Sequence, residues 1–139
     1  MRYEKIAAIG VPEPKPRSYS NCKKVGDQVF ISGMVAWDEQ GRPLGGNDAY
    51  EQSRIIFGYI KKLMEAAGGT IDDVMTMTVH TTDMRHQPDF WKARAEFFTG
   101  DFPCSTLVCV HSLFLPQLLI EVGATGVIGA GLADQDTLA

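Results

Sequence analysis

The chain has 139 residues, of which 45% are hydrophobic and 22% charged, and this ordinary globular composition excludes a disordered or collagen-like protein. With 17 acidic and 13 basic residues, the formal charge is −4, which excludes the basic footprint that gives proteins affinity for duplex nucleic acid. The length predicts a single domain over residues 1–139.

Cys22, Cys104 and Cys109 form neither a CxxC pair nor a spacing typical of metal ligands. An odd number of cysteines is typical of free thiols in a reducing compartment. The apolar stretch Leu113–Leu132 contains Glu121 and several glycines, which argues against a membrane span. We therefore expect a cytoplasmic protein with no bound metal and no membrane partner.

The first half of the chain begins with strand signals. Alternating apolar residues predict a strand at Gln28–Val35, paired with Ser18–Val25 through a Gly26-Asp27 turn. Tyr3–Ala8 is compatible with an earlier strand, and Asp38–Gly46 is predicted to be a loop.

A long helix is expected next. Asp48 is placed to cap it, Glu51 to reach back in a capping box, and Gly68 to end it. A short helical turn at Thr70–Asp73 and a half-buried strand at Met75–His80 follow.

Pro88 suits the first turn of a second helix, whose apolar stripe extends to Phe98. Two final strands are predicted at Ser105–Leu113 and Leu118–Val127. The order β-β-α-β-α-β-β indicates an α+β fold, with two helices against one mixed sheet. The open face of the sheet is expected to be covered by self-association, because apolar side chains fall on both faces of the last strands, at Leu107, Val108, Val110, Leu119 and Val122.

Glu121 is the first candidate for chemistry, because it lies inside the apolar run Leu118–Val122. A carboxylate in such surroundings is costly unless it is paired, hydrogen-bonded or protonated. It is either a carboxylate at a sheet edge or in an interface ion pair, or a general acid/base in a cleft.

Arg94 lies four residues from both Phe90 and Phe98 and so falls on the apolar stripe of its helix. It either buries its stem and extends its charged head to water, or binds an anion. His80 and His111 lie on predicted strands without a second ligand at metal spacing, and a structural role is the simpler interpretation.

Five segments resemble, in order and spacing, the Rid family, also called the YjgF or L-PSP endoribonuclease family. They are Tyr19-Ser20-Asn21-Cys22, Val29–Met34, Met64–Val74, Phe97-Phe98 before Pro103, and Ile120-Glu121-Val122. The resemblance covers about residues 17–128 and leaves 129–139 as a C-terminal tail. The run His111–Glu121 is most similar to the branch that contains 2-aminomuconate deaminases.

The resemblance implies a fold like chorismate mutase of the AroH type, a mixed sheet with two helices on one face. It also implies a homotrimer whose three sheets form a barrel-like core, with small-molecule sites in the clefts between subunits. Enzymes of this family hydrolyse reactive imines and enamines to a keto acid and ammonia, without a metal or an organic cofactor.

The resemblance also assigns residues to the site. Glu121 matches the glutamate that helps to hold and activate water, Tyr19 the pocket tyrosine, and Ser32 with Gly33 the pocket strand. The family's carboxylate-binding arginine lies in a Pro-x-Arg-Ser/Thr motif. Ser105 stands at the arginine position here, and Thr106 follows it.

Two further departures lie on the second helix, where Trp91 replaces a common Asn and Arg94 a common Tyr. These changes predict a rebuilt pocket for a larger or less anionic ligand, in which Arg94 is one candidate to replace the missing cation. The main hypothesis is a pathway-specific imine or enamine deaminase with an unidentified substrate. A non-enzymatic binding protein is the alternative, and the acidic charge argues against an endoribonuclease or translation inhibitor.

Overall fold

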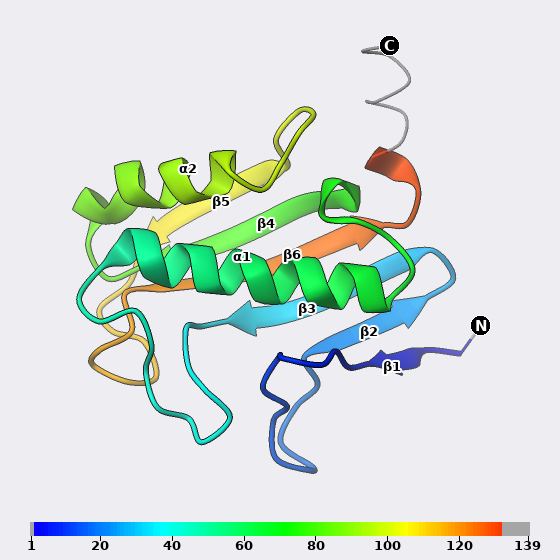
Figure 1. Cartoon of the computed structure of the whole chain (residues 1–139), viewed down its shortest axis with the longest axis horizontal. Coiled ribbons are helices and arrows are strands. Elements are labelled where there is room, and N and C mark those ends of the chain that lie inside the picture. Colours follow the sequence, from blue (N-terminus) through cyan, green and yellow to red (C-terminus); the bar gives the residue numbers. More distant parts are fainter. Residues whose placement is uncertain (1, 132–139) are drawn as a thin grey trace.

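One mixed sheet with two helices over one of its faces forms the body of the molecule in a computed structural model that describes residues 2–131 (Figure 1). The predicted α+β fold is therefore confirmed. The helices are α1 (Ala49–Ala66) and α2 (Gln87–Ala95), with short 3-10 turns η1 (Ile71–Asp73) and η2 (Met84–His86). The strands are β1 (Glu4–Ile6), β2 (Cys22–Val25), β3 (Gln28–Met34), β4 (Val74–Thr81), β5 (Cys104–Cys109) and β6 (Ile120–Val127).

The order of strands across the sheet is β1-β2-β3-β6-β4-β5. The last strand, β6, lies between β3 and β4 and pairs antiparallel with both. Strands β4 and β5 pair in parallel, with α2 in the connection between them, as parallel neighbours require. The sheet thus brings residues from three separate parts of the chain together around β6.

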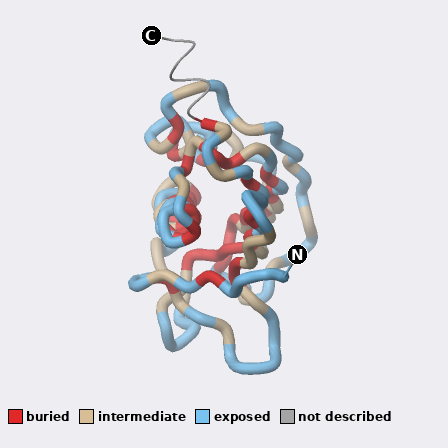
Figure 2. The backbone as a smooth tube through the Cα atoms, turned by 90° about the vertical axis from the view of Figure 1, so that its right-hand side faces the viewer, coloured by how far each residue is buried: buried red, intermediate tan, exposed pale blue. Residues whose placement is uncertain are grey.

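The core lies between the helices and the sheet, where Figure 2 shows most of the buried backbone. Helix α1 contributes a buried stripe that includes Ile56, Ile60 and Leu63, none of them more than 1% exposed. Burial of each such side chain stabilises the fold by about 1.5–3 kcal/mol. The Phe57 ring lies 5.4 Å from that of Phe90, which ties α1 to α2.

Several predicted boundaries are corrected. Helix α2 ends at Ala95, before the predicted end of its apolar stripe at Phe98. Strand β2 begins at Cys22 instead of Ser18, and β5 ends at Cys109 instead of Leu113, so both strands are shorter than predicted. Asp48 caps α1 as predicted, accepting bonds from the N–H groups of Tyr50 and Glu51. The Glu51 carboxylate pairs with Arg54 at 3.4 Å, and no contact links it back to Asp48.

The face of the sheet away from the helices is less apolar than predicted. Leu119 and Val122 are buried, and Val108 is the only one of the five expected apolar residues that is exposed. Phe30 and Val127 add exposed apolar surface on the same side, since they alternate with buried neighbours on β3 and β6. Exposed threonines account for much of the remaining face, at Thr76, Thr78, Thr106 and Thr125.

The start of the predicted C-terminal tail is anchored. The Gly131 N–H donates to the Asp73 carboxylate at 2.8 Å, and the other oxygen of that buried group accepts from the Thr70 N–H at 2.9 Å. Residues 132–139 of the predicted tail lie outside the described residues, and the division into core and tail stays a prediction. Within residues 2–131, no helix is both long enough and apolar enough to cross a membrane.

Candidate functional site

Glu121 on β6 lies directly opposite His80 on β4 in the antiparallel ladder. Directly opposed residues point to the same face, and both neighbours of Glu121 are buried, so the pair lies on the helix-free face. The Glu121 Oε2 atom is 3.6 Å from His80 Nδ1, and the side chains are 33% and 35% exposed. The carboxylate is thus half-buried, reachable from solvent and next to a titratable ring.

Gly33 provides the space that the Glu121 side chain occupies. The ladder between β3 and β6 shifts register between Ile31 and Met34, which places Gly33 beside Glu121. A Cβ atom at Gly33 would lie only 2.7 Å from the Glu121 Cδ atom, too close for any real contact. This close approach requires glycine, although its backbone φ is not in the left-handed region.

Tyr19 lies near the same carboxylate. Partial burial raises the pKa of its phenol, and the negative charges of Glu121 and then Glu13 raise it further. Ser32 precedes Gly33, and its N–H donates to the Asn21 carbonyl at 2.9 Å. The structure thus places Gly33 against Glu121 and Tyr19 within reach of its charge, with Ser32 next to Gly33 on β3; their roles in a site stay predictions.

Three buried side-chain polar atoms among the described residues have no hydrogen-bond partner: Ser32 Oγ, His80 Nδ1 and Arg94 Nε. Buried polar atoms are nearly always satisfied in native proteins, and exceptions concentrate at catalytic or ligand sites. His80 Nδ1 lies 3.6 Å from the Glu121 carboxylate, and Ser32 directly precedes Gly33, which supports the choice of this part of the sheet as the candidate site.

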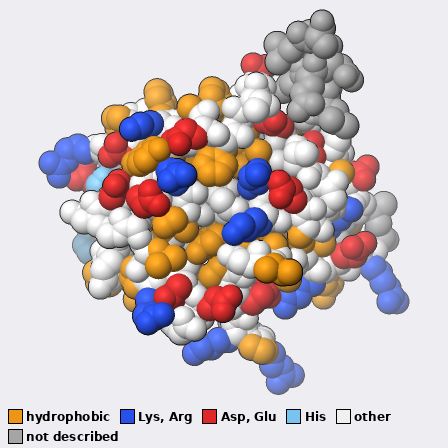
Figure 3. Space-filling model, viewed as in Figure 1, with side chains coloured by type: hydrophobic (Ala, Val, Ile, Leu, Met, Phe, Trp, Pro, Cys, Tyr) orange, Lys and Arg blue, Asp and Glu red, His pale blue; other side chains and the backbone are white. Residues whose placement is uncertain are grey.

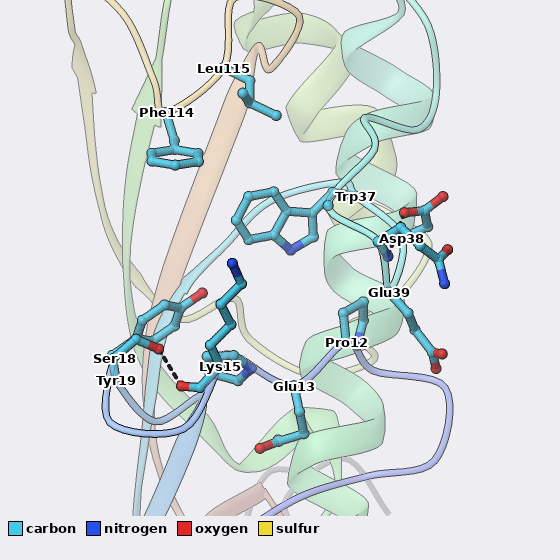
Figure 4. Close-up of a pocket in the computed structure, with 13 residues that line it drawn as sticks. Pro12, Glu13, Lys15, Ser18, Tyr19, Trp37, Asp38, Glu39, Phe114 and Leu115 are labelled. Atoms are coloured by element: carbon cyan, nitrogen blue, oxygen red, sulfur yellow. Dashed lines mark hydrogen bonds between the residues drawn. The ribbon is translucent and has the colours of Figure 1, made fainter.

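A pocket of about 450 Å³, lined in part by Tyr19, lies between the segment before β2, the loop after β3 and the loop before β6 (Figure 4). Trp37 forms one wall, and the Tyr59 hydroxyl of α1 donates to its carbonyl at 2.6 Å. Phe114 meets the Trp37 ring edge-on, with ring centroids 6.0 Å apart. Tyr19 lines this pocket, and the Glu121 charge contributes to the raised pKa of its phenol, so Tyr19 links the pocket to the neighbourhood of the carboxylate, which does not itself line the pocket.

Arg94 and Trp91 lie on α2, on the helical side of the sheet. The Arg94 guanidinium lies over the rings of Phe102 at 4.6 Å and Trp91 at 5.3 Å, and burial lowers its pKa. It forms no ion pair within the described residues. Within one subunit Arg94 and Glu121 belong to opposite sides of the sheet.

Ser105 and Thr106 lie on the edge strand β5, and β4 separates them from Glu121. Ser105 is opposite the buried Met77 and so points toward the helical side, whereas Thr106 is opposite Thr78 and shares the face of Glu121. Ser105 was expected near Glu121, and one subunit does not bring them together. Any such meeting requires a neighbouring copy of the chain.

Sequence reasoning assigned His80 a structural role and did not single out Trp37, Lys15 or Phe114. His80 pairs with Glu121 only because β6 inserts between β3 and β4, and no local pattern reveals that pairing. Phe114 could have been identified from the sequence as a candidate binding residue, because it is a large aromatic residue in a loop that contains Pro116. In residues 2–131, no group of three His, Cys, Asp or Glu side chains is arranged to hold a metal ion.

Comparison with known proteins agrees with this geometry. A family model described as endoribonuclease L-PSP matches residues 12–128. A protein of unknown function from Pseudomonas aeruginosa is 34% identical, with 92% of this chain and 94% of that chain covered and a TM-score of 0.81. RidA from an Antarctic Psychrobacter bacterium is 26% identical, with 90% and 99% covered and a TM-score of 0.79. YyfA of the conserved Rid protein family, from Yersinia pestis, shares the fold at 22% identity, with 91% and 100% covered and a TM-score of 0.83.

Proposed function

Because the chain belongs to the endoribonuclease L-PSP family, also called the Rid family, we propose that it hydrolyses reactive imines or enamines to a carbonyl compound and ammonia. The observation that carries this proposal is the Glu121 carboxylate, half-exposed on the sheet between Gly33 and His80. A carboxylate placed in this way can accept a proton from water while its own position stays fixed by the strands.

The proposed reaction begins with water held by Glu121. The carboxylate takes a proton from this water as the water oxygen bonds to the imine carbon, and it passes that proton to the imine nitrogen, which gives a carbinolamine. In the second step the carboxylate takes the hydroxyl proton of the carbinolamine and passes it to the amine nitrogen; the C–N bond then breaks, ammonia leaves and the carbonyl group forms. His80, 3.6 Å from Glu121, is placed to exchange protons with the carboxylate between these steps.

We further propose that the working site lies between subunits of a homotrimer. Exposed Phe30 and Val108 on the helix-free face support association through this surface. Ser105, Trp91 and Arg94 do not face Glu121 in their own subunit. In the proposed trimer they therefore line a cleft together with the Glu121 of a neighbouring subunit. Thr106, which shares the face of Glu121, belongs to the same proposed cleft.

The finer assignment is a pathway-specific deaminase of the branch similar to 2-aminomuconate deaminases, supported by the run His111–Glu121. The position of Ser105 at the family's arginine stays a prediction. We propose a cytoplasmic location, supported by three free cysteines. RNA cleavage is not favoured, since Lys and Arg are interspersed with Asp and Glu on the helical face (Figure 3).

A non-enzymatic binding protein is the second candidate, favoured by the pocket beside Tyr19. One experiment separates the two. An L-amino-acid oxidase produces imino acids in the reaction mixture from a panel of L-amino acids, and the release of ammonia is followed with and without the protein. We expect acceleration by the wild type, and at least a hundredfold loss in Glu121→Gln, which keeps the shape but cannot take a proton.

Glu65→Gln is the matched control, because Glu65 is a surface carboxylate on α1 whose ion-pair partner within residues 2–131 is Lys61. It should retain full activity. If neither the wild type nor Glu65→Gln accelerates hydrolysis of any imino acid, while small carboxylic acids still bind, the deaminase proposal fails and the binding protein replaces it.

A further inference from the structure

The pocket beside Tyr19 contains one cation, Lys15, which has no carboxylate partner among the described residues. In Figure 4 its amine points into the space between Tyr19 and Trp37. Three carboxylates also line the pocket: Glu13 pairs with Lys5 at 3.6 Å, Asp38 pairs with Arg42 at 2.8 Å, and Glu39 forms no ion pair within residues 2–131. In Figure 4 the Glu39 carboxylate points away from the Lys15 amine, which leaves Lys15 available to an anion between Tyr19 and Trp37.

The walls around this cation are aromatic. Trp37 and Phe114 meet edge-on at an interplanar angle of 85°, and Tyr19 lies across the space from them (Figure 4). Phe114 is 81% exposed, which is unusual for a phenylalanine. Flat aromatic surfaces around an open slot favour planar ligands, which can stack on one ring or meet the edge of another.

The turn that carries Lys15 and Tyr19 is held in one conformation. The Ser18 N–H and hydroxyl both donate to the Lys15 carbonyl. Between them Arg17 has φ of 65°, the only positive φ at a non-glycine residue in residues 2–131. Such backbone strain concentrates at binding sites, where it fixes groups before the ligand arrives.

We propose that this pocket is a subsite for a planar, unsaturated carboxylate. The carboxylate pairs with Lys15, and the planar body lies against Trp37 and Phe114. The inference rests on the proposed function: the reacting C=N carbon then lies on the Tyr19 side, toward Glu121. The substrate class becomes imines or enamines with a conjugated or aromatic acid group, for which a volume of about 450 Å³ is sufficient.

The test uses trans-cinnamate as a stable probe, with cinnamamide as the uncharged analogue and cyclohexanecarboxylate as the non-planar one. Calorimetric titration of the full chain should show cinnamate binding more tightly than both analogues. Lys15→Met should weaken cinnamate by about tenfold, while Lys15→Arg retains most of the affinity. Lys61→Met, the same charge change on an exposed face of α1, should leave cinnamate binding unchanged.

Phe114→Ala should weaken cinnamate by about tenfold with a smaller effect on cyclohexanecarboxylate. The proposal is overturned if cinnamate affinity is the same in Lys15→Met as in wild type, or if cinnamamide binds equally well. It is also overturned if Phe114→Ala lowers the oligomeric mass without changing cinnamate affinity, since another copy of the chain would then fill the pocket.

The two proposals fail in different ways. Glu121→Gln should abolish imine hydrolysis but keep cinnamate affinity within about twofold, since the carboxylate lies outside the aromatic slot. Cinnamate binding without any hydrolysis would refute the deaminase and leave the subsite standing. Hydrolysis that cinnamate does not inhibit competitively would refute the subsite and leave the deaminase standing.

Discussion

Replacing Gly33 by alanine tests the site without removing any chemical group from it. The new methyl carbon would lie 2.7 Å from Glu121 Cδ, whereas ordinary contact begins at 3.4 Å. The carboxylate must therefore move by about 0.7 Å or rotate away. Misplacement of a catalytic group by about 1 Å can cost a hundredfold in rate, so we expect a fall in imine hydrolysis of roughly 30- to 100-fold.

The stability of Gly33→Ala should change little. The atom that must move is the end of a flexible side chain, and loss of glycine lowers the entropy of the unfolded chain by an amount worth about 0.4–1 kcal/mol. Thermal unfolding of the variant should therefore occur within a few degrees of wild type. This combination separates a displaced carboxylate from a damaged fold.

Gly123→Ala is the matched control, two residues from Glu121 on the same strand and the same face. A Cβ at Gly123 would meet only backbone atoms, at 3.5 Å or more, so its activity should stay within about twofold of wild type. Both variants are assayed for ammonia release from imino acids formed in place. Equal activity of the two alanine variants would refute the role given to the Glu121 position.

Three further predictions follow from other parts of the structure. Light scattering should give three times the chain mass of 15.3 kDa, and Phe30→Asp should shift the protein toward monomer because it charges the proposed interface. Ser105→Arg should raise the rate of 2-aminoacrylate hydrolysis, measured as pyruvate release, by up to about a hundredfold. If the wild type is already as active as a relative that has the arginine, another cation must bind the substrate carboxylate. Burial raises the pKa of Cys22 to about 11 from 9.0, so the unfolded chain loses the thiol proton at a lower pH than the folded protein does. The free energy of unfolding, measured by denaturant titration, should therefore fall by about 2 kcal/mol as the pH rises from below 9 through 11. The free energy of unfolding of Cys22→Ala should fall less over the same pH range.

Local patterns were sufficient for most of the elements. The Asp48 cap, the Gly26-Asp27 turn and the 3-10 turn before β4 all depend on residues within a few positions of one another. Element ends were less predictable. The aromatic residues Phe97 and Phe98 continue the stripe of α2 in sequence, but they pack on Phe57 from beyond the helix, so tertiary contact mimics helical periodicity.

The candidate site was predictable only in part. The apolar run around Glu121 marked the carboxylate as unusual, and the resemblance supplied Tyr19 and Gly33. The His80 contact depends on the order of strands, which no segment encodes alone. Ser105 shows the converse, since adjacency in a family motif did not indicate that its side chain points away from the face of Glu121.

Strand register fixes the Glu121–His80 pair, whereas three loops supply Lys15, Trp37 and Phe114. A slip of one residue in either strand would turn that strand's member of the pair toward the core and its buried residues to the surface, so the pair cannot change position without loss of the fold. Loops tolerate substitutions and insertions far better than strands. The proposed ligand preference can therefore change through the loops while the groups proposed to transfer protons stay in place.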